Sequence, residues 1–330
     1  MTVAEPVRPP PFVDPVTGAA IVVFAIGCAV GVVSLYLLLL PGLRVFPAAV
    51  GFAALLQLAV LVVGWGLLRW MRPVHAPPPV PSLLGPLWGA VAAIGCAVLA
   101  NDALLSLWAK LTTVDFASSW GAALTAPLNE ELLKLAGVAL LALVFPGALR
   151  GPLDGLILGA LTGLGFQVVE NVSYSVNLIV QSGATAPTTS VVQSFVARVV
   201  LTGPGSHWAM SAVAGAGLGH LVAGRRHLAA PLVSAAVAMH WLFDAPLLSA
   251  SAAPLIKVGV NFLAFAAAYF LLRRAYRIRA RRVLTQASSL REAGVLLTRY
   301  RRREAVQQAP PGPARTAVAA RQRALLALID

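Results

Sequence analysis

Long apolar runs separated by short polar segments occupy most of the chain. A run of about 20 apolar residues is long enough to cross a bilayer as an α-helix. We therefore predict an all-α fold, a polytopic membrane bundle of about eight transmembrane helices. The predicted spans are 18–40, 47–70, 84–108, 120–145, 153–180, 194–223, 228–250 and 253–273.

Three ionisable residues interrupt the fourth run, Gly121 to Phe145: Glu130, Glu131 and Lys134. Each charge at the centre of a membrane helix costs roughly 2.5–3.5 kcal/mol, so these groups must pair or meet water. Lys134 lies one helical turn after either glutamate, and its ammonium can reach both. An ion pair that holds helices together is one interpretation. We favour a functional site, because ionisable residues inside membranes are usually functional.

Four further polar residues lie inside later runs: Glu170, His207, His240 and Asp244. Counted at 1.5 Å per residue from the cytoplasmic helix ends, these residues and Glu130 lie at depths of about 18–26 Å. Rare polar groups at one level on four helices predict a single buried site. The sequence Gly203-Pro204-Gly205 predicts a break in the sixth span, and irregular backbone at this depth is tolerated where it is buried or lines water.

Composition supports a membrane protein, since 58% of the 330 residues are hydrophobic, only 11% are charged, and mean hydropathy is +0.81. A soluble protein typically has about 25% charged residues. Of the formal net charge of +13, the segment 273–330 contributes +11, from 14 arginines against three acidic residues. A basic segment directly after a last span indicates a topology signal and a contact for anionic lipid. We expect no nucleic-acid partner.

These patterns divide the chain into three parts: a proline-rich disordered segment (1–17), a transmembrane domain (18–273) and a basic helical tail (274–330). The positive-inside rule places both termini in the cytoplasm, which makes the chain a multi-pass plasma membrane protein. In the tail we predict over Val283–Glu304 either an amphipathic helix that lies on the inner leaflet or a solvated helical extension, and a break at Ala309–Pro313.

The remaining ionisable residues have simpler explanations. Arg198 is expected to extend its charged end toward the membrane surface. Four residues fall near helix ends or in loops, where solvation explains them: His75, Asp154, His220 and His227.

The polar residues occur in a recognisable order. The chain reads Glu130-Glu131-x-x-Lys134, then Phe166-x-x-x-Glu170-Asn171, then His207, then His240-x-x-x-Asp244. Over residues 120–250 this order resembles the PrsW family of intramembrane proteases, distant relatives of the CAAX prenyl endopeptidases. Lys134, Glu170 and Asp244 depart from the prenyl endopeptidase pattern and favour PrsW. The resemblance implies proteolysis of a membrane-protein substrate, a class that in this family includes membrane-anchored anti-sigma factors.

Peptide hydrolysis needs an activated water, a group that stabilises the oxyanion and a proton for the leaving amine. The expected base is Glu130 or Glu131, tuned by Lys134. His207, and His240 oriented by Asp244, are expected to polarise the carbonyl or to hold the water. In one version His207, His240 and a glutamate, for which Glu170 is the candidate, bind zinc; otherwise Glu170 shares a proton with the first pair. In the other version the glutamate acts without metal, and the chain contains no HExxH motif that would support the first.

Two alternatives use the same residues differently. A proton-coupled transporter also places Glu, His and Lys at the membrane midplane. Such a carrier often has matched broken helices in an inverted repeat, and the sequence has only one clear break. A membrane scaffold would use the charge pairs only to hold its helices together.

Overall fold

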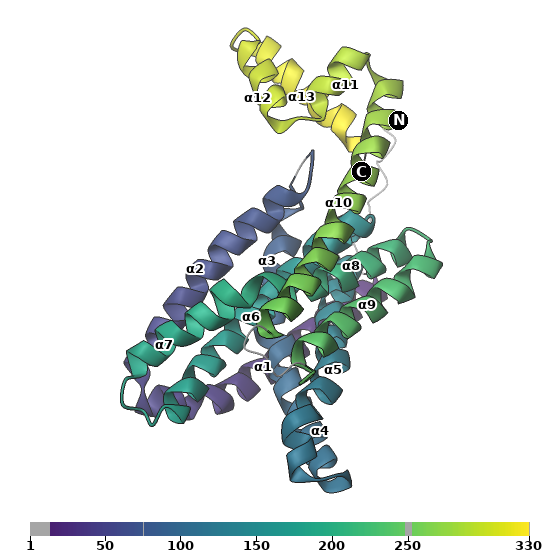
Figure 1. Ribbon diagram of the computed structural model, residues 1–330. Helices are drawn as coiled ribbons and strands as arrows, with labels where there is room; N and C mark the ends of the chain where they lie inside the picture. The colour runs from purple at the N-terminus through teal and green to yellow at the C-terminus, as the bar shows by residue number, and fades with distance from the viewer. Residues whose placement is uncertain (1–13, 75, 248–252, 330) are drawn as a thin grey trace, which may run out of the picture.

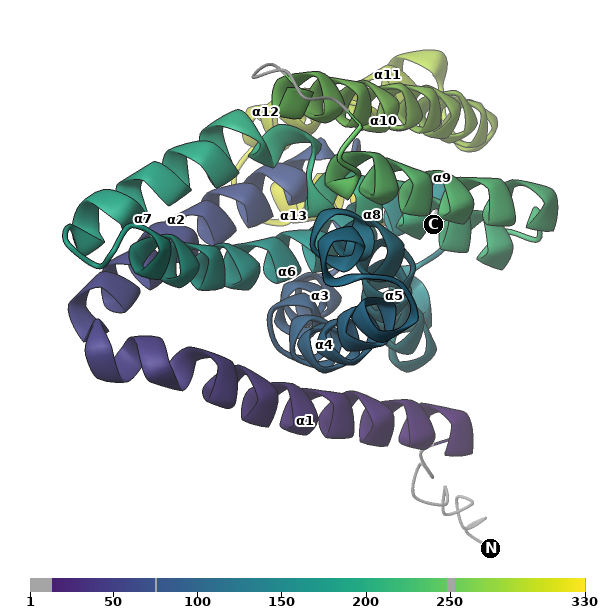
Figure 2. The ribbon, with the colours of Figure 1, turned by 60° about the horizontal axis from the view of Figure 1, so that its bottom comes forward.

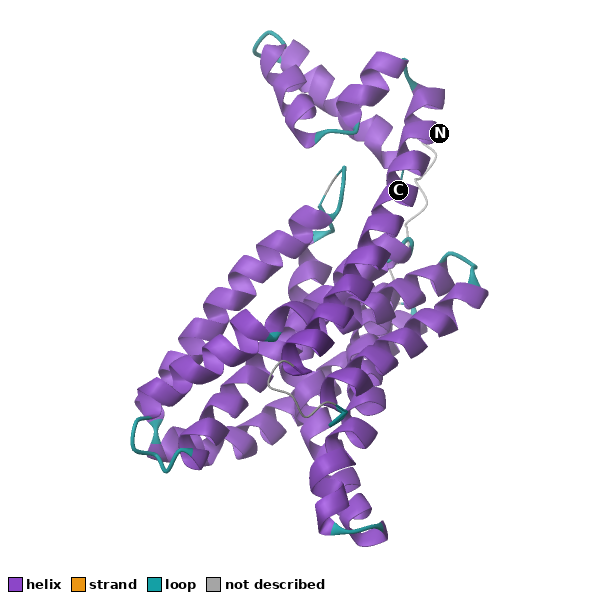
Figure 3. Ribbon diagram, viewed as in Figure 1, coloured by secondary structure: helices purple, strands orange, loops and turns teal. Residues whose placement is uncertain are grey.

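The computed structural model describes residues 14–74, 76–247 and 253–329, and all regular elements in these ranges are helical (Figures 1 and 3). The bundle helices are α1 (Pro15–Val45), α2 (Pro47–Met71), α3 (Pro79–Trp88), α4 (Ile94–Leu111), α5 (Val114–Val144), α6 (Pro152–Gln181), α7 (Pro187–Phe195), α8 (His207–Val222), α9 (Arg226–Asp244) and α10 (Ala253–Ala287). Three short helices follow: α11 (Leu290–Leu296), α12 (Arg299–Gln308) and α13 (Pro313–Ala327).

Some predictions concern residues at the edges of the described ranges. The predicted disorder of 1–17 extends too far, because α1 begins at Pro15, where Asp14 accepts a hydrogen bond from the backbone of Thr17 and caps the helix. Residues 1–13, His75 and the end of the seventh predicted span, 248–250, lie outside the described residues.

Five helices in the described part of the chain are long and apolar enough to cross a membrane. They are Pro15–Val45, Pro47–Met71, Pro79–Leu111, Pro152–Gln181 and Ala253–Ala287. The third of these consists of α3 and α4 joined by a π-helical turn, η1 (Gly89–Ala93). These five correspond to the first, second, third, fifth and eighth predicted spans. The other three are not confirmed as spans: α5 contains the Glu130–Lys134 cluster, the sixth is divided, and α9 is not among the five candidates.

Helix α6 lies at the centre of the bundle (Figure 2), and all of its residues from Leu153 to Val168 are buried. By contrast, only 11% of the most apolar window of α1 is buried, and this helix lies along one edge of the bundle. A helix that is buried on all sides needs small residues where neighbours approach closely. Glycines at four-residue spacing in α6, Gly155, Gly159 and Gly163, meet this need.

The predicted break at Gly203-Pro204-Gly205 is confirmed. After α7 the chain forms a π-helical turn, η3 (Val196–Leu201), and then a 3-10 turn, η4 (Gly203–Gly205), before α8 begins at His207. The divided segment still runs antiparallel along α6: Ser194 bonds Ser175, and the backbone of Ser211 approaches Gly159. The break therefore locally unwinds this segment without separating it from α6.

Replacing Gly159 by valine should destabilise the bundle. A Cβ atom at this position would collide with the backbone carbonyl of Ser211, and a backbone cannot rotate away as a side chain can. Overpacking of this kind costs about 1–3 kcal/mol. We expect a lower thermal unfolding midpoint in detergent. The matched control is Gly51→Val on α2, where nothing lies within 4 Å of the added Cβ, and an equal loss in both variants would contradict close packing as the cause.

The tail forms a folded helical group beyond the end of the bundle where α10 emerges (Figure 1). The prediction of one helix over Val283–Glu304 is wrong, because α10 extends to Ala287 and the chain then bends twice. The predicted break at Ala309–Pro313 is confirmed, and α13 folds back. Leu284, Leu296 and Ile329 bury one another around Val74 of the α2–α3 connection. The arginines of the tail thus surround an apolar core of its own.

Candidate active site

Helix α5 carries a fully buried charged triplet. The side chains of Glu130, Glu131 and Lys134 are at most 5% exposed. The Lys134 ammonium lies 2.8 Å from Oε1 of Glu131 and 3.4 Å from Oε2 of Glu130, so it bridges both carboxylates as their spacing predicts. It also lies over the ring of Phe166 on α6, 4.1 Å from its centre. The ion pairs among these three residues thus lie within α5, and their further contacts come from other helices.

His207 stands at the first position of α8, immediately after the break. Its Nδ1 lies 3.0 Å from the Lys134 ammonium, and its Nε2 lies 2.9 Å from Oε2 of Glu170 on α6. The break therefore brings an imidazole between α5 and α6, where both of its nitrogens meet charged groups. With a 3% exposed side chain, His207 is shielded from bulk water.

His240 on α9 approaches from the opposite side, and its ring meets that of His207 edge-on at 4.9 Å. Its Nδ1 lies 3.1 Å from Oε1 of Glu131. Its Nε2 lies 3.4 Å from Asp244 and 3.8 Å from Oε2 of Glu130. The sequence interpretation gave the orienting role to Asp244, but Glu131 is the closer carboxylate and holds the other ring nitrogen.

Three further residues support the cluster, and sequence reasoning assigned none of them to it. Asn101 of α4 donates a 3.0 Å hydrogen bond to Oε1 of Glu130, and Ser211 of α8 donates one of 2.8 Å to Glu131. Arg198 pairs with Glu170 and lies over the ring of Tyr174, so the expectation that it extends to the membrane surface is wrong. The sequence contains a signal for two of them: Arg198 is a charge, and Asn101 an amide, inside a predicted span. A serine in an apolar run is no such signal, so Ser211 could not have been predicted.

A cavity of about 190 Å³ opens onto the cluster. At about 30 Å³ per molecule in the liquid, it has room for several waters. Its polar lining residues are Asn101, Thr125, Glu130, Glu170, Tyr174, Arg198, His207, His240 and Asp244. Glu131 and Lys134 are not among the lining residues. Of the two adjacent glutamates, Glu130 faces the cavity and Glu131 lies behind it.

The structure thus brings together all seven residues singled out in the sequence, from α5, α6, α8 and α9. The similar depths counted along their predicted spans thus correspond to one place in the structure. Glu170 differs most from its expected role as a metal ligand, because Arg198 and Nε2 of His207 both contact its carboxylate.

Three residues of this cluster fit a metal ion. Ligand atoms of Glu130, His207 and His240 all lie within 4.8 Å of one another, and all three residues are buried. Each histidine also has a carboxylate at a ring nitrogen, Glu170 for His207 and Glu131 for His240, which is the arrangement that orients metal-binding imidazoles. With both histidines neutral, four carboxylates and two basic groups leave a formal charge of −2, which a divalent ion would balance.

A buried carboxylate–histidine cluster on helices, open to a water-sized cavity, has the parts that a hydrolase working inside the membrane requires. Residues 78–272 match the family model described as PrsW family intramembrane metalloprotease. This match covers more than half of the chain, and the chain belongs to that family. No match was found among curated proteins or among solved structures.

The matched range is wider than residues 120–250, on which the resemblance was noticed. It begins at α3 and ends within α10, so it includes Asn101 as well as the seven predicted residues. Helices α1, α2 and α11–α13 lie outside it. Family membership supports a membrane-embedded protease and does not favour the transporter.

Proposed function

We propose that this protein is a zinc-dependent intramembrane endopeptidase that hydrolyses a peptide bond in or near the membrane-spanning part of another protein. The observation that carries the proposal is the position of Glu130, at the wall of a buried cavity and within ligand distance of His207 and His240. Because the charges are buried, an unused cluster would be costly to keep.

Glu130, His207 and His240 would hold the metal. Zinc held by these three residues would supply an activated water as the nucleophile at neutral pH. Binding at Nδ1 of His207 requires Lys134 to give up its 3.0 Å contact with that nitrogen and to keep its ion pair with Glu131. Glu170 is better suited to orient His207 than to act as the third ligand, since Arg198 also holds it.

The remaining cavity residues have roles in the same reaction. Asp244 lines the cavity with a 19% exposed side chain and lies beside Nε2 of His240, where it would accept the proton of the attacking water and pass it to the leaving amine. Arg198 and Asn101 contribute a cation and an amide donor to the cavity wall, where they would stabilise the developing oxyanion.

The proposal includes a setting in the membrane. Eight spans with both termini in the cytoplasm of a plasma membrane protein would leave the arginine tail beside anionic lipid. The substrate would be a membrane protein, for which a membrane-anchored anti-sigma factor is a candidate, and no nucleic acid is involved. The sixth predicted span is divided into α7 and α8. It is still compatible with eight spans, because α7 and α8 together run along the length of α6.

Metal removal tests the proposal. We expect detergent-purified protein to contain one zinc per chain by elemental analysis and to cleave members of a panel of single-span substrates. Dialysis against a chelator should abolish cleavage, and added zinc should restore it. Glu170→Gln should weaken metal binding about 10–100-fold, because it loosens an outer partner of His207.

The variants His207→Ala and His240→Ala should lose the zinc while keeping the helical circular dichroism spectrum. Full cleavage by protein that contains no metal would reject the zinc site but not the protease. No cleavage of any substrate by zinc-loaded protein, together with solute uptake into liposomes, would reject the protease.

A further inference from the structure

A second cavity, of about 580 Å³, lies in the folded tail, between α12, α13 and the α2–α3 connection. Sites for small molecules typically have volumes of about 300–1,000 Å³. The charged lining residues of this cavity are Arg299, Arg302, Arg303 and Arg323. We call it the tail pocket, and it shares no residue with the candidate active site.

The tail pocket is a groove between two helix faces. Its lining residues on α12 begin at Arg299 and recur at i+3, i+4, i+7 and i+8, and those on α13 begin at Ala319 and recur at i+3, i+4 and i+7. Residues at this spacing lie on one side of a helix. Gln322 of α13 donates a 3.2 Å hydrogen bond to the backbone carbonyl of Arg302 and joins the two faces. The arginines of the two helices therefore line one shared space.

Backbone carbonyl groups hold two of these arginines in place. Arg299 donates a 2.7 Å hydrogen bond from Nη2 to the carbonyl of Arg72. Arg302 donates to the carbonyls of Val74 and Leu296. A guanidinium group has five N–H donors, so both side chains retain donors for a ligand. A carbonyl orients a guanidinium group without neutralising its charge, so the wall of the tail pocket contains two positioned cations.

No carboxylate balances the charge of the tail pocket among the described residues. No acidic residue in the described ranges lines it, and none of its four arginines forms an ion pair there. Glu304, the acidic residue of α12, accepts a 3.2 Å hydrogen bond from Gln308 instead. Burial and the charge of neighbouring arginines lower the pKa of the Arg299 and Arg302 guanidinium groups. The four arginines give the pocket a formal charge of +4, and like charges in a partly enclosed space favour an anion among them.

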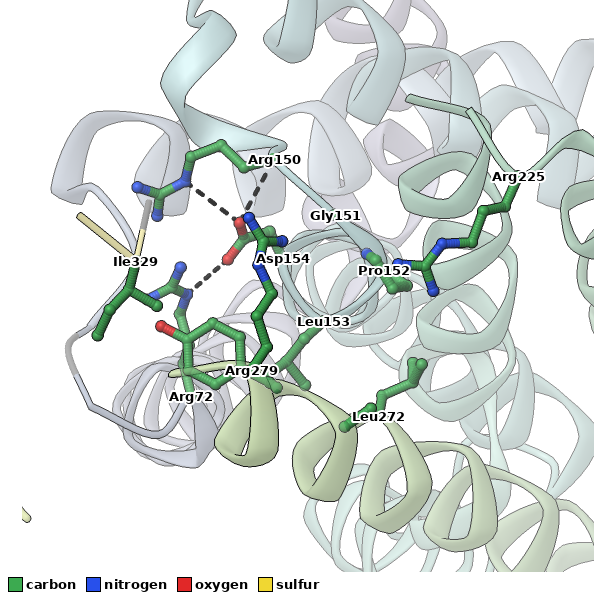
Figure 4. Close-up of a pocket in the computed structure, with 12 residues that line it drawn as sticks. Arg72, Arg150, Gly151, Pro152, Leu153, Asp154, Arg225, Leu272, Arg279 and Ile329 are labelled. Carbon is green, nitrogen blue, oxygen red and sulfur yellow. Dashed lines mark hydrogen bonds and ion pairs between the residues drawn. The ribbon is translucent and has the colours of Figure 1, made fainter. Parts of the chain in front are cut away.

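Other arginines of this region are paired with carboxylates. At the start of α6, Arg72 donates from Nε to Oδ1 of Asp154, and Arg150 lies 3.4 Å from the other carboxylate oxygen (Figure 4). The expectation that Asp154 is simply solvated is wrong, since its side chain is 8% exposed. In the tail, Arg321 of α13 forms a two-point ion pair with Glu292, at 2.6 and 2.9 Å. The four arginines of the tail pocket differ from these, because their charge is available to a ligand.

Phosphate groups fit this arrangement best. The planar guanidinium group binds two phosphate oxygens at once. One phosphate monoester carries a charge of about −1.5 to −2 at pH 7, so four arginines match two such groups. The aliphatic lining residues Val306 and Leu326 provide a surface for the remainder of the ligand.

We propose that the tail pocket binds a ligand with two or more phosphate groups. A bound ligand would bridge α12 and α13 and hold them against the α2–α3 connection, because all three line the pocket. A soluble diphosphate has this chemistry, and so does the head group of a lipid with two phosphates, such as cardiolipin. The proposal is independent of the reaction at the active site.

The test uses the full-length protein in an uncharged detergent, with sodium pyrophosphate, cardiolipin or sodium sulfate added at equal ionic strength. The thermal unfolding midpoint is recorded against the concentration of each probe, because a ligand that binds only the folded protein raises it. We expect a rise with pyrophosphate or with cardiolipin, and the probe with the higher apparent affinity identifies the soluble or the lipid source. Arg303 and Arg323 are exposed residues, so the fold should not depend on them. Arg303→Gln with Arg323→Gln should weaken the binding by about tenfold or more, since each change removes a charge-assisted contact.

The matched control is Arg281→Gln with Arg301→Gln, which removes the same charge from exposed residues of α10 and α12 outside the tail pocket. It should keep the affinity of the wild type. Equal weakening by both pairs would overturn the pocket in favour of a diffuse basic surface. The proposal is also overturned if neither phosphate probe raises the midpoint, or if sulfate raises it as much, since screening of the charge of the tail would then explain the effect.

Discussion

The variant Glu130→Gln should lose peptide cleavage by roughly 10³-fold or more and should no longer retain zinc, while it still folds with the helical circular dichroism spectrum of the wild type. A group positioned for proton transfer typically contributes 10²–10⁴-fold, and we expect the loss of a metal ligand to fall in the same range. Glutamine preserves the shape of the side chain and still accepts the hydrogen bond from Asn101. The fold should therefore survive a change that removes the reaction.

The adjacent variant Glu131→Gln is the matched control, since it makes the same change one residue away. Glu131 does not line the cavity and holds His240 from behind. We expect a loss of about 10–100-fold, typical of an outer partner of a metal ligand. Cleavage and zinc content are measured on the same preparations of both variants.

Two outcomes would contradict this assignment. If Glu131→Gln is inactive and Glu130→Gln is not, the roles of the two glutamates are reversed. If Glu130→Gln lowers folding and yield but the surviving protein cleaves normally, the cluster is a scaffold that only holds the helices together.

The sequence was sufficient to predict that these polar residues lie together, because membrane depth is encoded in one dimension. Counting 1.5 Å per residue along each apolar run is enough to show that Glu130, Glu170 and His207 share a level. The number of residues along a run does not show which face of the helix points toward the site. Which glutamate faces the cavity depends on how α5 packs against α4 and α9, and that information resides in tertiary contacts.

The same limit explains the errors in assigning partners. Arg198 and Asp154 were judged from their positions in the chain, near predicted helix ends. Their partners, Glu170 and Arg72, lie 28 and 82 residues away in the sequence. Asn101 is similar, because one amide in an apolar run is a weak signal until Glu130 is placed beside it.

The span prediction is unconfirmed where the length of a helix and its charge give conflicting signals. Helix α5 is 31 residues long, but Glu130, Glu131 and Lys134 place three charges within five residues of it, more than the apolar window of a candidate span contains. The tail was mispredicted for a different reason. Its arginines suggest a surface helix, but Leu284, Leu296 and Ile329 meet only after the chain has bent twice.

Replacing Lys134 by methionine should cause the largest loss of stability of any single change in the cluster. The 1% exposed ammonium is shared by two buried carboxylates, and its removal leaves both without their nearest positive charge. Breaking a buried ion pair by removing one partner costs about 3–5 kcal/mol. We expect a sharply lower unfolding midpoint and a poor yield of folded protein in detergent.

The double variant Lys134→Met with Glu131→Gln separates charge from packing. It removes one carboxylate along with the ammonium, and a buried pair replaced as a whole is often close to neutral in stability. The midpoint should therefore recover much of what the single variant loses. Cleavage should stay low, because the neutral amide at position 131 orients His240 less well than a carboxylate does. A single variant as stable as the wild type would instead mean that the bound ion, and not Lys134, balances the charge of Glu130 and Glu131.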